Sequence, residues 1–152
     1  MKIIIAAVGR FRAGPEQELF NTYTERLSWD VSLKEIAFKK VLGTQGRVKE
    51  EGRLLFSCLP PNIHKVVLEQ RGKKLSSEEF AAQISSWRDS GVRKIAFLIG
   101  GADGHAAEVM ARANFVLSLG DMVWPHMLVR ALIAEQLYRA HSILAGHPYH
   151  RS

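Results

Sequence analysis

The sequence contains a single cysteine, Cys58, among its 152 residues. One cysteine cannot form a disulfide within the chain, which is typical of a protein in a reducing cytoplasm. The neighbouring residues Leu55, Phe56 and Leu59 are apolar, so we interpret Cys58 as a small buried hydrophobic residue rather than a nucleophile. No group of histidines and cysteines has the spacing of metal ligands, and we predict no metal site.

Long apolar runs are also missing, since no stretch approaches the roughly 20 residues that a transmembrane helix needs. The apolar run at residues 1–9 is short, and Arg10 and Arg12 follow it where a signal-peptide cleavage site would be expected. We therefore interpret this run as a buried first strand, and we expect a cytoplasmic protein that does not bind a membrane.

Two common phosphate-binding motifs are absent. The glycine-rich stretch at residues 100–104 has neither the Gly-x-Gly-x-x-Gly spacing of dinucleotide-binding folds nor the Lys-Ser/Thr pair of a P-loop. A nicotinamide-dependent or ATP-dependent enzyme is therefore disfavoured. The paired glycines Gly100 and Gly101 permit close approach of the backbone to a ligand, although a tight turn after a strand explains them equally well.

Acidic residues are outnumbered, with 15 Asp and Glu against 21 Lys and Arg and a formal net charge of +6. Such a balance is weak support for a polyanionic partner. The basic residues gather at residues 39–49, at residues 71–74 and at the C-terminal end. Each cluster taken alone is explained equally well as a solvated surface.

What the sequence does contain is a regular alternation of apolar strand-like runs and helical patterns. We predict strands at residues 2–8, 31–38, 64–69, 94–99 and 115–119, and helices at residues 15–27, 47–59, 76–90, 106–113 and 125–145. Glycine-bearing loops are expected at residues 39–46 and 70–73. The pattern predicts one α/β domain over residues 1–152, with a mainly parallel sheet that carries helices on both faces.

The clearest local signal is a capping box, in which Ser76 is the N-cap of a helix and Glu79 is its third residue. Gly91 is expected to end that helix in a left-handed conformation.

The last three predicted strands each end in a polar or glycine-containing loop, and ligands of parallel sheets bind at the carboxyl ends of strands. In the last of these loops Asp121 is suited to a turn or to an amino group, and Trp124 to a flat ring or to the core. His126 and Arg130 are spaced to share one face of the final helix, near the end that attracts anions. A helix cap or a packing role remains an alternative for both.

The final helix is followed by a tail at residues 146–152 that contains His147, Tyr149, His150 and Arg151. Chain ends are usually loose and polar. These side chains can contact phosphate, stack on a base and move a proton, so the tail is a candidate part of a functional site.

Five motifs in this order resemble one known family. They are Leu-Ile-Gly-Gly at 98–101, Leu-Ser-Leu at 117–119, Pro-His-x-Leu-Val-Arg at 125–130, Glu-Gln-Leu-Tyr-Arg-Ala at 135–140, and His-Pro-Tyr-His-Arg at 147–151. Together they resemble the RlmH family, bacterial 23S rRNA (pseudouridine-N3) methyltransferases of the SPOUT class. The match covers essentially the whole chain. Trp124 and the pair Gly120-Asp121 differ from the residues that are common in the family, which implies a donor pocket of somewhat different shape.

The resemblance implies an α/β fold whose C-terminal part forms a trefoil knot, a feature otherwise nearly absent from proteins. It also implies S-adenosylmethionine as the methyl donor and no metal. The substrate would be N3 of a pseudouridine in a 23S rRNA stem-loop, near the decoding centre of the assembled ribosome. The enzyme would act as a homodimer in which each tail helps to complete the site of the partner.

Transferred residue by residue, the resemblance implies three sets of site residues. The donor contacts would be Leu68, Glu69, Gly100, Gly101, Gly120, Asp121, Met122, Val123, Trp124 and Pro125. The RNA contacts would be His126, Arg130, Arg139, His147, Tyr149 and Arg151. The catalytic residues would be Tyr149, His150 and Arg151.

The roles of the three catalytic residues stay open. His150 can assist removal of the imide proton, because histidine titrates near neutrality. Arg151 can stabilise the imide anion or bind phosphate, and Tyr149 can stack on the base or hydrogen-bond it. Two alternative functions are a SPOUT-class methyltransferase that acts on tRNA and a non-catalytic RNA-binding α/β module.

Overall fold

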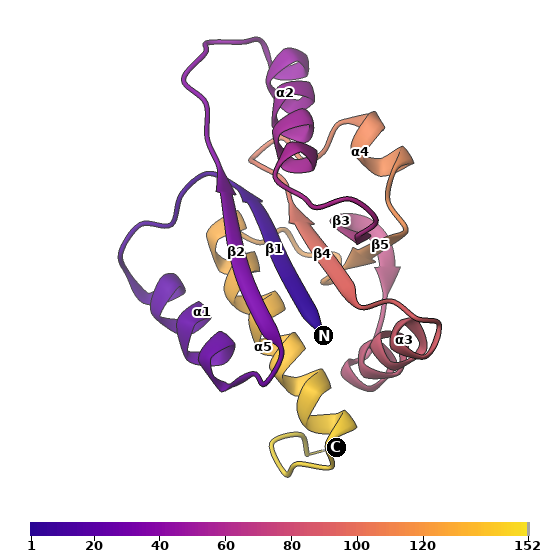
Figure 1. Ribbon diagram of the computed structural model, residues 1–152. Helices are drawn as coiled ribbons and strands as arrows, with labels where there is room; N and C mark the ends of the chain where they lie inside the picture. Colours follow the sequence, from indigo (N-terminus) through magenta and orange to yellow (C-terminus); the bar gives the residue numbers. More distant parts are fainter. Residues whose placement is uncertain (152) are drawn as a thin grey trace.

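The computed structural model describes residues 1–151, which form a five-stranded parallel sheet in the order β2-β1-β4-β3-β5 (Figure 1). The strands are β1 Lys2–Val8, β2 Asp30–Ile36, β3 His64–Lys74, β4 Lys94–Ile99 and β5 Phe115–Ser118. The helices are α1 Pro15–Arg26, α2 Thr44–Ser57, α3 Ser77–Asp89, α4 Ala107–Ala111 and α5 His126–Leu144. The predicted strands and helices are all present, although α4 is shorter than predicted and α2 begins at Thr44, within the loop predicted at residues 39–46.

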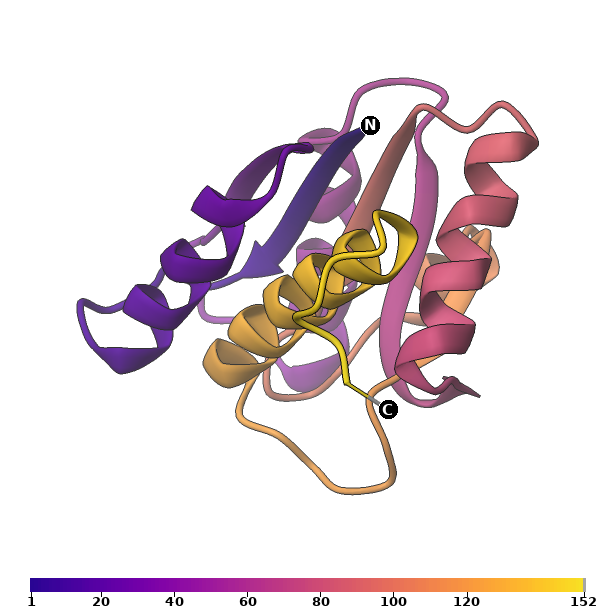
Figure 2. The ribbon, with the colours of Figure 1, turned by 90° about the horizontal axis from the view of Figure 1, so that it is seen from below.

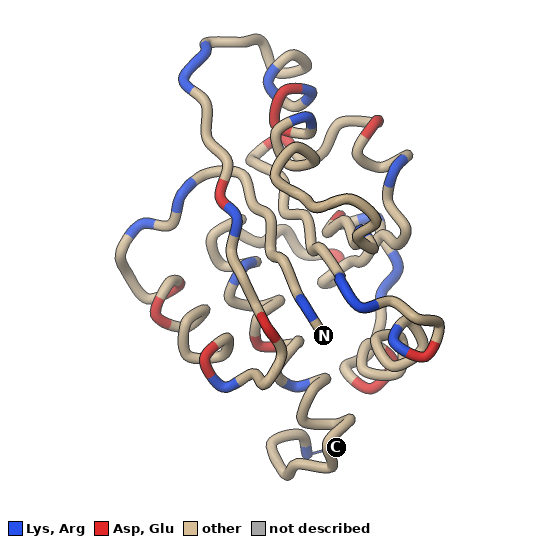
Figure 3. Tube along the Cα trace, in the orientation of Figure 1, with Lys and Arg blue, Asp and Glu red and all other residues tan. Residues whose placement is uncertain are grey.

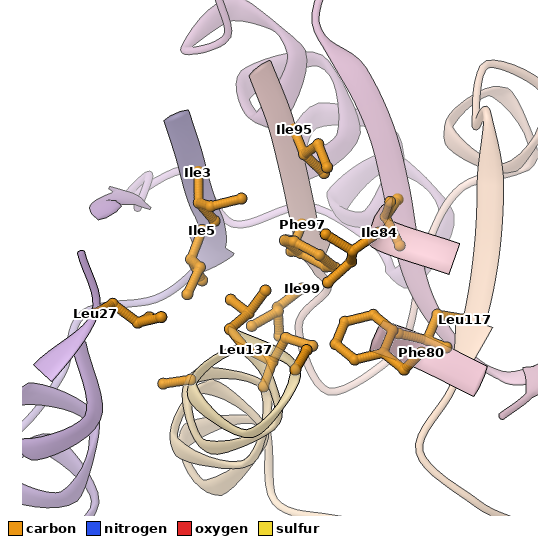
Figure 4. Close-up of a cluster of buried hydrophobic side chains, with 14 of the residues drawn as sticks. Ile3, Ile5, Leu27, Phe80, Ile84, Ile95, Phe97, Ile99, Leu117 and Leu137 are labelled. Atoms are coloured by element: carbon orange, nitrogen blue, oxygen red, sulfur yellow. The ribbon is translucent and has the colours of Figure 1, made fainter. Parts of the chain in front are cut away.

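Alternate residues of the central strands build two separate cores, because successive side chains of a strand point to opposite faces. Ile3 and Ile5 of β1 pack with residues of α1, α3 and α5 on one face, where Leu137 of α5 is fully buried (Figure 4). Ile4 of β1 packs on the other face with Leu55 of α2 and with residues of α4. The predicted α/β sheet with helices on both faces is confirmed, while the trefoil knot stays a prediction.

The start of α3 forms as the sequence predicts. The Ser76 hydroxyl accepts a hydrogen bond from the backbone N–H of Glu79, and the Glu79 carboxylate accepts one from the backbone N–H of Ser76. Gly91 follows the helix with a φ of +90°, as expected of a left-handed C-terminal residue.

The loop predicted at residues 70–73 is wrong, because β3 continues through it to Lys74. Its pairing with β5 shifts register between Leu68 and Lys73, which is an irregularity that absorbs extra residues within the strand. A Cβ at Gly72 would lie 2.8 Å from the backbone carbon of Leu117, so only glycine fits this close approach. The charged, glycine-bearing sequence resembles a loop locally, and its strand conformation depends on the distant β5.

Cys58 is half-buried, and its thiol donates a hydrogen bond to the Leu55 carbonyl at 3.0 Å. Burial raises the pKa of the thiol, which disfavours the nucleophilic thiolate. Within residues 1–151, no helix has the length and apolar character to cross a membrane, and no cluster of acidic, histidine or cysteine side chains is arranged to hold a metal ion.

Candidate active site

A cavity of about 670 Å³ lies at the carboxyl ends of β3, β4 and β5. All but one of the predicted donor contacts line it, namely Leu68, Glu69, Gly100, Gly101, Gly120, Met122, Val123, Trp124 and Pro125. His126, at the start of α5, lines it as well. Residues from three separate loops are therefore brought together, although their contact with a donor stays a prediction.

The loop after β4 turns so tightly that it leaves its backbone open to the cavity. The backbone N–H of Gly104 donates to the Gly101 carbonyl at 3.1 Å, and Gly104 has a φ of +76°. A Cβ at Gly100 would lie 2.8 Å from the Gly104 carbonyl oxygen. A side chain at position 100 would therefore force the turn apart, and glycine is required to shape this wall of the cavity.

The loop between β5 and α5 is fixed to the end of β3. The Ser118 hydroxyl donates to the Gln70 carbonyl at 2.9 Å, and the Asp121 carboxylate pairs with Lys74 at 2.5 Å. This ion pair engages Asp121, the one predicted donor contact that does not line the cavity. Met122 and Val123 are 73% and 83% exposed, which leaves an apolar loop at the mouth of the cavity.

Glu69 and His105 are ionisable residues in the wall of the cavity. The Nε2 atom of His105 is buried there without a hydrogen-bond partner. Burial lowers the pKa of His105, and the nearby Glu69 carboxylate opposes that shift. His105 is therefore neutral at pH 7 and lies in the cavity wall together with Glu69.

Arg130 is fully buried one turn after His126. Its guanidinium donates to the Glu35 carboxylate at 2.9 Å and to the backbone carbonyls of Val8 and Gly9 at 2.8 Å. The predicted RNA contact of Arg130 stays a prediction, and this burial favours a structural role. The pKa of His126 is lowered by burial and by the Arg130 charge, so His126 is neutral near pH 7.

Residues 146–151 of the tail fold back along α5, and His150 contacts both α5 and α3 (Figure 2). The Tyr149 hydroxyl donates to the Glu135 carboxylate at 3.1 Å, and the Arg139 guanidinium pairs with the same carboxylate at 2.5 Å. Arg139 also lies 4.9 Å from the centre of the Tyr149 ring. Burial and the hydrogen bond with Tyr23 raise the pKa of Tyr149, so its phenol stays protonated and acts as a donor.

His150 is held between two helices. Its Nε2 atom lies 2.7 Å from the Glu78 carboxylate of α3, and its Nδ1 atom lies 3.3 Å from the Arg139 guanidinium of α5. His147 and Arg151 are exposed, and the backbone N–H of Tyr149 donates to the His147 ring at 3.2 Å. Ser152, the last residue of the predicted tail, lies outside the described residues. The structure thus brings Arg139, Tyr149 and His150 together, while their roles stay predictions.

Basic residues also occupy the loop between β2 and α2 and the loop that follows β1 (Figure 3). Lys39, Lys40, Arg10 and Arg12 are exposed there, as a surface for a polyanion would require. In the predicted cluster at residues 39–49, Arg47 forms an ion pair with Asp103.

Three residues of the site were missed by the sequence analysis. Glu135 organises the tail, Glu78 contacts His150, and His105 faces the cavity. Glu135 could have been found from the sequence, because it is spaced at i and i+4 from Arg139 on one helix, which predicts an ion pair. The contacts of Glu78 and His105 depend on chain segments that are distant in sequence, so local patterns could not reveal them.

Comparison with known proteins gives concordant results. A family model described as "Predicted SPOUT methyltransferase" matches residues 1–150. The chain is 53% identical over 151 residues to the Ribosomal RNA large subunit methyltransferase H of Paramagnetospirillum magneticum, with 99% of each chain covered. It is 49% identical over 152 residues to the protein of the same name from Rhodospirillum centenum, with both chains fully covered.

Among solved structures, the chain resembles a probable methylase family protein from Haemophilus influenzae Rd KW20. The TM-score is 0.58 at 13% sequence identity, over 99% of this chain and 70% of the other. At this identity, the likeness concerns the fold alone.

Proposed function

Because the chain belongs to the SPOUT methyltransferase family, we propose that it transfers a methyl group from S-adenosylmethionine to N3 of a pseudouridine in 23S rRNA. The target is a stem-loop near the decoding centre of the assembled ribosome. The names of the full-length relatives support the ribosomal substrate. The observation that carries the proposal is the cavity that the ends of β3, β4 and β5 form together.

The cavity fits the donor in size and chemistry. Its volume of about 670 Å³ lies within the usual range for small-molecule sites. Gly100 and Gly101 allow the backbone to contact an adenosine, and Trp124 offers a flat apolar surface. The Glu69 carboxylate favours a positively charged ligand. S-adenosylmethionine supplies a methyl group on a positively charged sulfur, which keeps the electron pair of the broken S–C bond.

The remaining task of the protein is to position the base and to accept its imide proton. The N3 atom loses that proton, and its electron pair then forms the new N–C bond. We assign this task to the tail. His150 accepts the proton, Arg151 stabilises the imide anion, and Tyr149 serves as a protonated hydrogen-bond donor because its pKa is raised. Alignment of the reactants and general base catalysis each lower the barrier substantially.

We further propose that two copies of this one-domain protein form a homodimer in the cytoplasm. The apolar residues Met122, Val123 and Trp124 stay exposed at the cavity mouth of the single chain. A partner that covers them would remove this apolar surface from water. The tail of that partner would then stand beside the donor cavity and the bound base.

Mass mapping of 23S rRNA from cells that lack the protein tests the reaction and the target together. We expect the loss of one methyl group from one pseudouridine, restored when purified protein and S-adenosylmethionine are added to the ribosomes. An unchanged methylation map would refute the proposal. Methylation of purified tRNA but not of ribosomes would favour the tRNA-modifying alternative.

A further inference from the structure

A second, smaller cavity of about 400 Å³ adjoins the proposed donor cavity. The two cavities share four lining residues, Leu117, Leu119, Gly120 and Trp124. The smaller cavity extends between the start of α3 and the middle of α5. The two cavities are therefore neighbours that meet at the carboxyl end of β5, the loop that follows it and the Trp124 side chain.

The walls of the smaller cavity combine an apolar floor with one oriented polar pair. Phe80, Leu132 and Ile133 supply apolar surface. The Ser77 hydroxyl donates to the Gln136 carboxamide oxygen at 2.8 Å, and the Gln136 amide nitrogen donates to Glu135 at 2.7 Å. These two bonds fix which way the carboxamide points. One amide N–H and one oxygen lone pair of Gln136 remain for a ligand.

We propose that this smaller cavity receives the base that is methylated, and that Gln136 recognises its imide edge. The inference rests on the proposed function and specifies the acceptor site. A uracil-type edge offers carbonyl acceptors beside an N–H donor, which complements the donor and acceptor of a carboxamide. An extruded base is commonly held by stacking and by such hydrogen bonds in a closely fitting pocket. The 39% exposed Trp124 supplies the aromatic face.

The position of the cavity suits a base that becomes an anion during the reaction. Ser76 and Ser77, at the N-terminus of α3, line the cavity, and the positive end of a helix dipole favours negative charge. The Glu79 carboxylate at this terminus is engaged by the backbone of Ser76, and the Glu78 carboxylate contacts His150.

Hydrogen bonds connect the cavity wall to the tail. Glu135 accepts from Gln136, from Arg139 and from Tyr149, and Arg139 in turn contacts His150. A base bound to Gln136 therefore borders the network that holds the tail of its own chain, whereas the tail proposed to act on the base comes from the partner. Two other cavities, one beside Pro61 and Arg93 and one between α2 and α4, share no lining residue with the donor cavity or the tail.

The substitution Gln136→Leu tests the proposal, because it keeps the approximate size of the side chain and removes both hydrogen-bonding groups. Gln83→Leu is the matched control, since Gln83 is half-buried on α3 and lines neither cavity. The readouts are single-turnover methylation of ribosomes from cells that lack the protein, calorimetric binding of S-adenosylmethionine, and thermal unfolding.

We expect Gln136→Leu to lower the methylation rate by about 10-fold or more, the scale of one lost hydrogen bond to a reacting group. Donor affinity and thermal unfolding should match those of Gln83→Leu. An unchanged methylation rate would overturn the acceptor pocket while the proposed function stands. Weakened donor binding would also overturn it, because the cavity would then belong to the donor.

If Gln136→Leu does not fold, Ser77→Ala is the variant to test. It removes only the hydroxyl that orients the carboxamide. The acceptor pocket predicts slower methylation with intact donor binding for this variant, and full activity would refute it. A wild-type protein that methylates no ribosomal RNA would instead refute the proposed function itself.

Discussion

The hydroxyl of Tyr149 lies 3.1 Å from the Glu135 carboxylate, so the tail of the chain is fastened to its own last helix. The Tyr23 hydroxyl, 3.3 Å away, comes from α1 and closes the contact from the other side. The tail is therefore a packed segment with defined partners. The position of its reactive side chains depends on α5 and α1 as much as on the tail itself.

The raised pKa of Tyr149 makes a spectroscopic prediction. Burial, the bond to Tyr23 and the Glu135 charge all disfavour the phenolate. In a titration followed at the phenolate absorbance band, wild-type protein and Tyr149→Phe should give the same absorbance up to about pH 10, the usual tyrosine pKa. Glu135→Gln should lower the pKa of Tyr149 only in part, because burial and the bond to Tyr23 remain. A difference between wild type and Tyr149→Phe below this pH would contradict the raised pKa.

Removal of residues 147–152 should separate donor binding from catalysis. Among tail residues 146–151, none lines the proposed donor cavity, so affinity for S-adenosylmethionine should be retained. Methylation of ribosomes should be abolished, because Tyr149, His150 and Arg151 are all lost. Calorimetry and transfer of a radiolabelled methyl group measure the two properties. A truncated protein that methylates ribosomes at the full rate would exclude the tail from the chemistry.

The substitution Gly100→Ala should weaken donor binding. Its Cβ would meet the Gly104 carbonyl oxygen at 2.8 Å, so the turn that walls the cavity must shift. Gly43→Ala is a suitable control, since a Cβ there meets nothing within 4 Å. We expect a loss of affinity of about 10-fold for Gly100→Ala, which corresponds to roughly 1.4 kcal/mol of strain. Equal affinities for the two variants would show that this turn does not shape the donor site.

The parts of the fold that the sequence predicted are those specified by local signals. The capping box of α3 and the uninterrupted apolar run of β4 each lie within one short segment, and both are present in the structure. The extension of β3 through Gly72 was missed because it depends on pairing with β5, more than 40 residues away. Long-range pairing leaves little trace in local composition.

In the candidate site too, the sequence predicted some features and missed those that depend on distant residues. The loops at the ends of β3, β4 and β5 were expected to converge from the rule for parallel sheets, and they do. The family resemblance implied an RNA contact for Arg130, and its spacing from His126 left open whether it binds a ligand or packs in the fold. Its burial follows from partners on β1 and β2 that no helical pattern encodes.

Acidification should destabilise the protein through His105. Its pKa is lowered in the folded state by burial, so below about pH 6.5 the unfolded chain binds a proton that the folded chain excludes. The contribution of His105 to the free energy of unfolding is therefore fully present above that pH. It falls as the pH drops toward the folded-state pKa, by at most about 1.4 kcal/mol per pH unit. His105→Asn should have a flatter dependence in urea unfolding between pH 7 and pH 5. Parallel curves for the two proteins would exclude His105 as the cause.

Replacement of Arg130 by methionine should destabilise the fold more than any loss of charge at the surface. The variant leaves the carbonyls of Val8 and Gly9 without their donors and Glu35 without its partner. Glu35 keeps 28% of its side chain exposed, so water partly compensates its charge. We therefore expect a loss of about 3 kcal/mol in the free energy of unfolding, near the lower bound for breaking a buried ion pair.

Urea unfolding measures this loss, and Arg12→Met is the control, because Arg12 is exposed in the loop that follows β1. The control should change the free energy of unfolding by no more than about 0.5 kcal/mol. The folded fraction of Arg130→Met should still bind S-adenosylmethionine in the absence of RNA, since Arg130 does not line the donor cavity. A stability equal to that of Arg12→Met, with a large drop in affinity for ribosomes, would instead assign Arg130 to the RNA contact that the sequence suggested.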